Sequence, residues 1–301
     1  MNIGNCDSMQ RAREILRKLD LPTFSIEYVE SHSNQVWMTR DYVVHYHVIG
    51  PVGRLEHEAR VASRLPPEVL YPEVVAVGRD GNHDWLVTKR VPGTILSAVW
   101  PSLDDKERCS AITEVAAALR AIHCSPAMDL IPPCLQRGVR VMSRRRLAHK
   151  LQALDISSSF HTLLEAEDPP YVMVHGDFTF NQALWHDGHI TAIYDLEMSH
   201  AETPDWDLGT FLEFCHDPVR MVPEYLEATT KREDYQKAPA LLQKVYPELL
   251  ACSQIKDRLA LYLLIFRFEE LITNAGMREQ IIDEAFDHAS ELADLLASVS
   301  D

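Results

Sequence analysis

Two aspartates in the segment 172–197 have the surroundings that phosphate transfer requires. Asp177 follows a predicted strand, and Asp195 stands at the end of the hairpin that comes next. Phosphate transfer to a hydroxyl uses one carboxylate to orient or deprotonate that hydroxyl. A second carboxylate and an amide oxygen hold magnesium on the nucleotide phosphates. Asp177 suits the first role and Asp195 the second, so the segment predicts a phosphotransfer site.

The distance between these aspartates along the chain is explained by the hairpin. They are 18 residues apart (195 − 177), but the predicted strands 183–185 and 190–194 meet at the tight turn Asp187-Gly188. Because a hairpin folds back on itself, it can return Asp195 close to Asp177.

The first 91 residues predict a small antiparallel sheet accompanied by helices. Alternating apolar and polar residues favour strands, and apolar residues three and four apart favour helices. The expected strands are 23–30, 35–39, 41–49, 74–78 and 84–90, and the expected helices are 9–19 and 54–65. Val91-Pro92-Gly93 then breaks the strand pattern, so we place the end of an N-terminal lobe at residue 91.

The remainder, 92–301, is predicted to be a larger and mainly helical lobe that carries the catalytic hairpin. Asp104 can cap a helix that runs to about His123, and a strand is expected over 171–174. Further helices are expected at about 136–154, 158–166, 205–216, 219–230, 236–250, 254–275 and 277–299. The fold class is therefore α+β with two lobes.

The composition argues against several kinds of partner. The 29 Lys and Arg residues against 45 Asp and Glu give a net charge of −16, which opposes binding to nucleic acid and would attract cationic ligands. No run approaches the roughly 18 apolar residues that a membrane span needs. The six cysteines include no C-x-x-C pair, which suggests a reduced compartment. We expect a cytoplasmic protein that contacts neither nucleic acid nor membrane.

The pattern His175-Gly176-Asp177, a hairpin and Asp195-Leu196-Glu197 resembles the signature of aminoglycoside phosphotransferases and choline kinase-like relatives. The resemblance extends over roughly residues 25–215 and includes the segments 31–37, 85–93, 119–123 and 204–208. It implies a bilobal fold like that of protein kinases, ATP or GTP as co-substrate, and Mg²⁺ as cofactor. In such enzymes Asp177 would be the catalytic base and Asp195 the magnesium ligand.

The resemblance also implies which residues contact the nucleotide. Segment 31–37 looks like the nucleotide loop, which makes Ser31 and Ser33 candidate contacts. Lys89 and Val91 lie in the segment that looks like the hinge, where the backbone would hold the nucleotide base.

Two positions depart from the family pattern. Glu58 falls where the N-lobe helix supplies its glutamate, and the register against it puts His45 where a strand lysine would contact the phosphates. A neutral imidazole supplies one donor and no charge, so phosphate affinity should be weaker unless Glu58 keeps His45 protonated. The amide expected five residues after Asp177 is Gln182 here, with Asn181 one step earlier, and either could reach the metal.

Other polar residues of the segment are expected to be structural. His175 is expected to form structural hydrogen bonds rather than to act as an acid or base, and His123 to cap or pack a helix end. Asp207 is expected to brace the catalytic loop from beneath.

These features predict a small-molecule O-phosphotransferase. It would move the γ-phosphate of ATP or GTP to a hydroxyl of an antibiotic, either aminoglycoside-like or another cationic polyhydroxylated compound, and so give resistance. A metabolic kinase of a small alcohol, amino acid or sugar is an alternative, because the same fold serves those reactions. A catalytically weak relative that binds a nucleotide or small ligand is a third reading, motivated by His45 and Gln182. The protein is expected to be a monomer or a homodimer.

Overall fold

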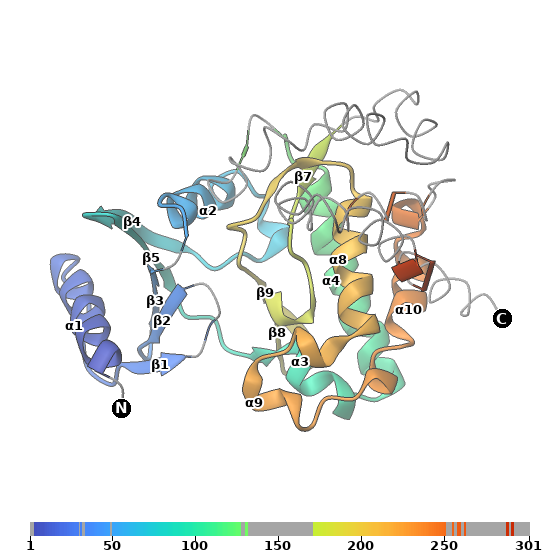
Figure 1. The fold of residues 1–301 in the computed structure, drawn as a ribbon, viewed down its shortest axis with the longest axis horizontal. Coiled ribbons are helices and arrows are strands. Elements are labelled where there is room, and N and C mark those ends of the chain that lie inside the picture. The colour runs from blue at the N-terminus through green and yellow to red at the C-terminus, as the bar shows by residue number, and fades with distance from the viewer. Residues whose placement is uncertain are drawn as a thin grey trace, which may run out of the picture.

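The computed structural model shows two lobes, a small sheet lobe and a larger helical one (Figure 1). It describes residues 3–29, 31, 34–48, 50–127, 130–131 and 171–250, and also 255, 258–259, 262, 287–288 and 290–291. The predicted helices 136–154 and 158–166 lie outside the described residues, as does most of 254–275 and 277–299. Within the described part, no helix is both long and apolar enough to span a bilayer.

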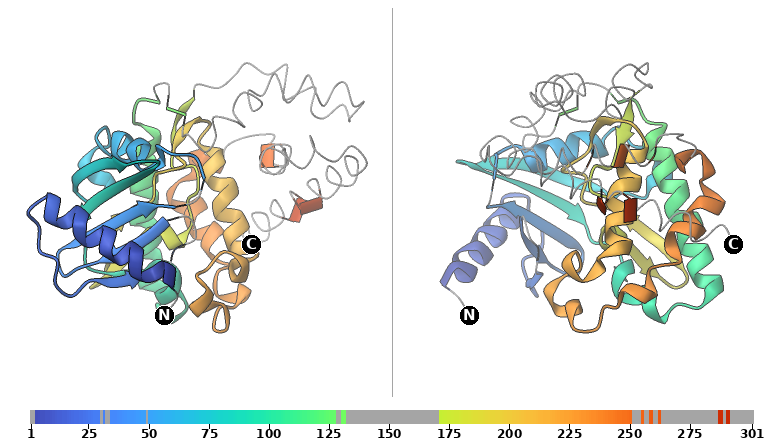
Figure 2. Two further views of the ribbon diagram at one scale, coloured as in Figure 1. Left: turned by 60° about the vertical axis from the view of Figure 1, so that its left-hand side comes forward. Right: turned by 45° about the vertical axis from the view of Figure 1, so that its right-hand side comes forward.

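The N-terminal lobe is a five-stranded antiparallel sheet with strand order β1-β2-β3-β5-β4. Its strands are β1 (Glu27–Val29), β2 (Asn34–Met38), β3 (Tyr42–His47), β4 (Val74–Asp80) and β5 (His83–Lys89). Helix α1 (Ile3–Lys18) packs Ala12, Ile15 and Leu16 against the apolar residues of one sheet face, which include Val44 and Tyr46. Figure 2 shows α1 lying along the sheet on the side away from the helical lobe. The predicted sheet with helices is confirmed.

Helix α2 (Arg54–Ala62) links the sheet to the segment that follows β9 (His189–Ile193). It packs against β4 and β5 and buries Leu55, Glu58 and Val61. The backbone amide of Leu55 donates to the buried carboxylate of Asp84 at 2.7 Å, so a residue of β5 fixes the start of the helix. The side chains of α2 are thereby positioned against the rest of the molecule.

Two short sheets and several helices form the C-terminal lobe. Strand β6 (Thr94–Ile95) pairs with β8 (Ala183–His186), which pairs with β9 (His189–Ile193), and β7 (Val172–Val174) pairs with β10 (His200–Glu202). The helices are α3 (Leu96–Val99), α4 (Asp105–His123), α8 (Asp205–His216), α9 (Glu224–Glu227) and α10 (Ala238–Val245). Single 3-10 turns occur at Pro67–Val69, Trp100–Ser102, Phe180–Gln182, Pro218–Arg220, Arg232–Asp234 and Pro247–Leu250.

The largest hydrophobic core supports the catalytic hairpin from the side of α4 and α8. Phe180, at the start of the hairpin, lies with its ring centroid 4.5 Å from Trp100 and 5.3 Å from Phe211 of α8. All three side chains are fully buried. The hairpin is therefore held rigidly at the point where the chain turns into it.

Two predicted helices are wrong in part, and prolines explain the difference. The predicted helix 219–230 is only the turn Pro218–Arg220 followed by α9, because a proline cannot donate a helical hydrogen bond and disfavours a helical conformation in the preceding residue. Pro223 lies between these two elements. The predicted helix 236–250 breaks at Tyr246, which precedes Pro247 and leaves the helical region with φ −137°.

Candidate active site

Asp207 holds the loop that carries Asp177. It is fully buried in the first turn of α8, and its two carboxylate oxygens accept hydrogen bonds from the backbone amides of His175 and Gly176, each at 2.8 Å. The ring Nε2 of His123, at the end of α4, lies 3.0 Å from the same carboxylate. Asp207 therefore braces the loop that carries Asp177, as predicted.

Gly176 allows the loop to pass close to the neighbouring chain. Its φ is 92°, in the left-handed region, and a Cβ at this position would lie 2.2 Å from the carbonyl oxygen of Met198. No residue with a side chain fits there without moving the backbone. His175 beside it is buried and donates a hydrogen bond from Nε2 to the carbonyl of Tyr194 at 3.0 Å, which confirms its structural role.

Asp177 differs from its neighbours because its side chain is exposed. Surrounding protein atoms raise its pKa to about 7, mainly by removing hydration and further through the negative charges of Glu197 and Asp207. Arg54 acts in the opposite direction. Water on the open side of the carboxyl group weakens the loss of hydration. An exposed carboxyl group with a pKa near neutral is suited to accept a proton from a bound hydroxyl.

Asp195 lies in the same group of acidic side chains. Its backbone has φ 67°, a left-handed conformation that is uncommon for a residue with a side chain and occurs often at functional sites. Its pKa is raised well above the usual value by burial and by the negative charges of Glu197, Glu58 and Asp177. The hairpin has thus returned Asp195 to the neighbourhood of Asp177.

Glu58 connects α2 to the segment that carries Asp195. Its Oε1 atom accepts a hydrogen bond from the backbone amide of Leu196 at 3.0 Å and another from the hydroxyl of Tyr71 at 2.8 Å. Burial and the charge of Glu197 raise the pKa of Glu58 to about 7. The described contacts of Glu58 are therefore with the segment 195–196 and Tyr71.

Glu197 receives two further contacts from the N-terminal lobe. The guanidinium group of Arg54 forms an ion pair with its Oε1 atom, and the side-chain amide of Asn34 donates to its Oε2 atom at 3.0 Å. Both contacts join residues more than a hundred positions apart in the chain. The two lobes are thus linked directly beside the carboxylates.

Sequence reasoning missed three of these contributors, namely Asn34, Arg54 and Tyr71. Arg54 could have been found, because it lies four residues before Glu58 and residues at this spacing share one face of a helix. Nothing in the sequence indicates a role for Tyr71. Its contact with Glu58 depends on how the chain runs between α2 and β4.

Both candidate amides are engaged in hydrogen bonds. The side chain of Asn181 accepts from Ser97 at 2.6 Å and donates to the carbonyl of Met221 at 2.7 Å, so it is tied to two other segments. The side-chain oxygen of Gln182 accepts from the amide and the hydroxyl of Thr179, at 2.9 and 2.6 Å. Gln182 is bonded only within its own turn by these contacts.

The candidate nucleotide residues lie on the N-terminal lobe and the connection that follows it. His45 is half-buried on β3, where it pairs with Val36 and Leu86, and burial lowers its pKa to about 4. At neutral pH it is therefore uncharged. Ser31 is exposed in the connection between β1 and β2, and Ser33 lies outside the described residues.

The connection after β5 brings the chain from one lobe to the other. Lys89 is exposed at the end of β5, with its ammonium group 2.7 Å from Glu73 and its backbone amide donating to the Glu73 carbonyl at 2.9 Å. Val91 follows, half-buried, before the chain enters β6.

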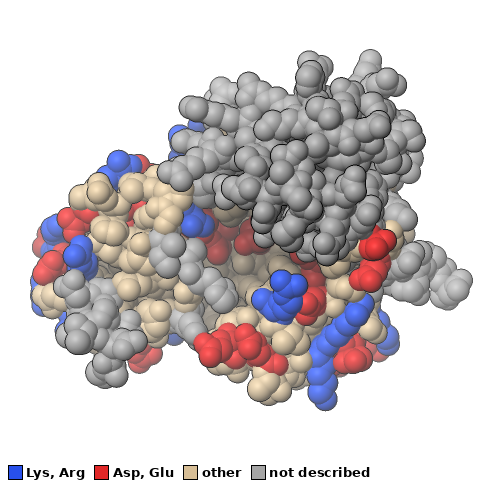
Figure 3. Space-filling view, in the orientation of Figure 1, with Lys and Arg blue, Asp and Glu red and all other residues tan. Residues whose placement is uncertain are grey.

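Carboxylates such as that of Asp195 are suitable ligands for a hard divalent cation. Mg²⁺ prefers oxygen ligands, and Asp195 lies among carboxylates whose mutual repulsion a cation would relieve. Figure 3 shows acidic side chains in the hollow between the two lobes. The donor set therefore suits magnesium, although the amide of Gln182 would have to release Thr179 in order to join it.

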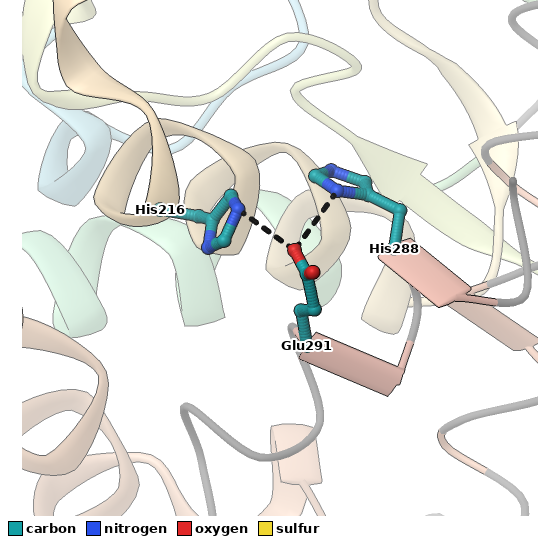
Figure 4. Close-up of side chains that lie close together, drawn as sticks. All are labelled: His216, His288 and Glu291. Carbon is teal, nitrogen blue, oxygen red and sulfur yellow. Dashed lines mark ion pairs between the residues drawn. The ribbon is translucent and has the colours of Figure 1, made fainter.

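A second group of possible metal ligands lies away from these carboxylates, at the end of α8. His216, His288 and Glu291 bring their ligand atoms within 4.8 Å of one another (Figure 4). However, Arg232 donates to the Nδ1 atom of His216 at 2.8 Å, so a neutral His216 carries its proton on Nε2, which faces Glu291 at 3.1 Å. The protonated nitrogen cannot bind a metal, and the contacts of the two histidines with Glu213 and Glu291 account for the group.

Comparison with known proteins supports one family. The profile of the phosphotransferase enzyme family matches residues 26–241. The chain is 32% identical over 238 residues to an aminoglycoside 3'-phosphotransferase of Streptomyces ribosidificus, an alignment that covers 74% of this chain and 81% of the relative.

Solved structures agree in fold. The GDP complex of aminoglycoside 2'-phosphotransferase-IIIa has a TM-score of 0.59 and 16% identity, and covers 94% of this chain and 97% of its own. A thermostable mutant of aminoglycoside phosphotransferase APH(4)-Ia in a ternary complex with ADP and hygromycin B has a TM-score of 0.54 and 15% identity, with 95% and 96% covered. These likenesses confirm the predicted bilobal, protein-kinase-like α+β fold.

Proposed function

Because the chain belongs to the phosphotransferase enzyme family, we propose that it transfers the γ-phosphate of ATP or GTP to a hydroxyl of an aminoglycoside-like antibiotic. One observation carries the proposal. The exposed Asp177 and the half-buried Asp195 lie in one group of carboxylates, in which the charge of Glu197 raises the pKa of both and the charge of Asp177 also raises the pKa of Asp195. Such a group is unfavourable unless it binds cations or protons.

Asp177 is the catalytic base in this proposal. Its exposed carboxylate accepts the proton of the acceptor hydroxyl as the hydroxyl oxygen bonds to the γ-phosphorus and the bond to the β-phosphate oxygen breaks. The nucleoside diphosphate leaves with that oxygen. The brace from Asp207 keeps the carboxylate in place while the proton moves.

Asp195 and Gln182 hold the magnesium ion, which when bound neutralises charge on the nucleotide phosphates. Of the two amides, Gln182 is the better candidate, because the described hydrogen bonds of its side chain stay within its own turn and can be released at the cost of its contacts with Thr179. Asn181 would have to give up both Ser97 and Met221.

The nucleotide lies between the sheet and the hairpin in this proposal. The backbone around Lys89 and Val91 holds the base, and Ser31, between β1 and β2, is a proposed phosphate contact. His45 contributes at most a neutral hydrogen bond, because burial lowers its pKa to about 4. Glu58 positions the segment that carries Asp195.

The acceptor is a cationic, hydroxyl-bearing molecule. The net charge of −16 attracts cations, and acidic side chains line the visible hollow between the lobes (Figure 3). The curated relative is named for action on aminoglycosides, which carry several amines and hydroxyls.

The test is to incubate the protein with MgATP or MgGTP and a panel of aminoglycosides, and to follow phosphorylated product by mass spectrometry. We expect one phosphate to be added to at least one aminoglycoside, and no product with Asp177→Asn. A panel of small alcohols, amino acids and sugars serves as the comparison. If only these compounds were phosphorylated, the acceptor would be a small metabolite and not an antibiotic.

A further inference from the structure

We propose that Arg54, the first residue of α2, supplies positive charge to the nucleotide phosphates. The proposal rests on the proposed function, since it needs a nucleotide beside Asp195. It identifies a contact that the sequence motif does not contain.

A nucleotide brings several negative charges into a site that is already acidic. Four acidic side chains lie close enough there to repel one another, namely those of Glu58, Asp177, Asp195 and Glu197. A single magnesium ion offsets only part of this repulsion. Phosphate sites in proteins therefore combine the metal with a cationic side chain, and the planar guanidinium group of arginine can bind two phosphate oxygens at once.

Arg54 occupies the position where such a cation acts on the functional carboxylates. It forms an ion pair with Glu197, two residues after Asp195, and its positive charge also acts on Asp177. Only 13% of the surface of its side chain is accessible to solvent, so water screens its charge poorly. Arg54 is thus directed toward the reacting groups rather than toward the solvent.

The guanidinium group of Arg54 retains donors for a further partner. The contact with Glu197 uses one Nη atom, and the buried Nε atom has no hydrogen-bond partner in the described part of the chain. A buried donor without a partner is costly, and an arriving phosphate would satisfy it. Gly50 leaves room beside the group, since a Cβ there would lie 3.5 Å from Nη1.

The backbone of Arg54 is anchored, while Glu197 does not depend on it. The amides of Leu55 and Glu56 donate to the buried carboxylate of Asp84 at 2.7 and 3.3 Å, which fixes the start of α2. Glu197 also accepts a hydrogen bond from Asn34. The guanidinium group can therefore turn from Glu197 to a phosphate while Glu197 keeps a partner.

The other candidate cation does not meet the requirement. His45 is uncharged at neutral pH, because burial on β3 lowers its pKa to about 4. Protonation of His45 would need the support of Glu58, but the described hydrogen bonds of Glu58 go to Leu196 and Tyr71. The charge that the phosphates need is therefore assigned to Arg54.

The test compares the affinities of a nucleotide and its nucleoside. Calorimetry measures binding of MgATP and adenosine, or MgGTP and guanosine if the wild type prefers them, to wild type, Arg54→Gln, Arg54→Lys and Arg79→Gln. Arg79 pairs with Glu56 on the exposed side of α2, so Arg79→Gln controls for the loss of one positive charge. We expect Arg54→Gln to bind the triphosphate about tenfold or more weakly, with unchanged nucleoside affinity. Arg54→Lys should recover part of the loss, and Arg79→Gln should bind as the wild type does.

Two results would overturn the assignment while leaving the proposed function standing. One is a wild-type affinity of Arg54→Gln for the triphosphate. The other is an equal loss of triphosphate and nucleoside affinity in Arg54→Gln and Arg54→Lys, which would mean that Arg54 only maintains the lobe arrangement. A wild type that binds neither nucleotide would count against the proposed function itself.

Discussion

The Oε1 atom of Glu58 accepts a hydrogen bond from the backbone amide of Leu196 at 3.0 Å. This bond joins α2 of the N-terminal lobe to the residue that follows Asp195. The position of Asp195, the proposed metal ligand, therefore depends on the lobe that is proposed to hold the nucleotide. Any motion between the lobes that breaks this bond would also disturb Asp195.

Replacement of Glu58 tests the importance of this connection. Glu58→Ala leaves the Leu196 amide and the Tyr71 hydroxyl without their acceptor, so we expect a loss of about 1–3 kcal/mol of unfolding free energy in urea. Glu58→Gln is the matched control, because its carbonyl oxygen can still accept. At about pH 6 the raised pKa of Glu58, about 7, keeps it mainly protonated, and Glu58→Gln should match the wild type. At about pH 8, Glu58→Gln should be more stable than the wild type, because the wild type then carries a buried negative charge that the variant lacks. Equal stability of all three proteins at both pH values would contradict this account.

Asp207→Asn tests the brace of the catalytic loop. The amide group cannot accept both backbone hydrogen bonds, so we expect a loss of about 1–3 kcal/mol at neutral pH together with lower activity. Burial alone would raise the pKa of Asp207, but hydrogen bonding and charge from His123 give a net lowering. Its stabilisation is therefore present above the unfolded-state pKa of about 4 and is lost as the pH falls below it. Asp187→Asn, at the exposed hairpin turn, should change stability by less than about 0.5 kcal/mol.

The pH dependence of the reaction should report Asp177. Only the ionised carboxylate can accept the hydroxyl proton, and its pKa is raised to about 7 by lost hydration and by Glu197 and Asp207. The value of kcat/KM should therefore rise with pH, reach half its maximum near the pKa of about 7 and level off at higher pH. Because Arg54 lowers this pKa, Arg54→Gln should move the rise to higher pH. A flat profile across this range would argue against Asp177 as the base.

Asp195→Ala should affect magnesium-dependent binding selectively. Removal of the carboxylate takes away a proposed metal ligand, so calorimetry should show weaker binding of the magnesium–nucleotide complex, with less change in nucleotide binding without magnesium. Affinity for the acceptor should change less. If magnesium–nucleotide affinity were unchanged, Asp195 would be structural only.

The sheet, the hairpin and the bilobal fold could be predicted because local patterns specify them. Apolar and polar residues alternate along 41–49 and 84–90, which indicates strands. The pair Asp187-Gly188 indicates a hairpin turn. The helix expected over 219–230 failed because Pro223 interrupts it. Strand β10 was missed because three residues carry no usable pattern.

The candidate site was predictable only where its residues stand in one segment. Asp177 and Asp195 belong to such a segment, whereas Arg54, Asn34 and Tyr71 meet the carboxylates through contacts between the lobes. The charge of His45 depends on how deeply its side chain is buried. The sequence around His45 does not determine that depth, so its neutral state could not be predicted.

The central claim is that Asp177 accepts the proton of the hydroxyl that receives the phosphate. The direct measurement is the rate of phosphate transfer to an aminoglycoside by Asp177→Asn and by the wild type, at saturating MgATP or MgGTP. Asparagine has nearly the same shape and cannot accept that proton, so we predict a loss of about a hundredfold or more with an unchanged melting temperature. Wild-type turnover by Asp177→Asn would contradict the claim.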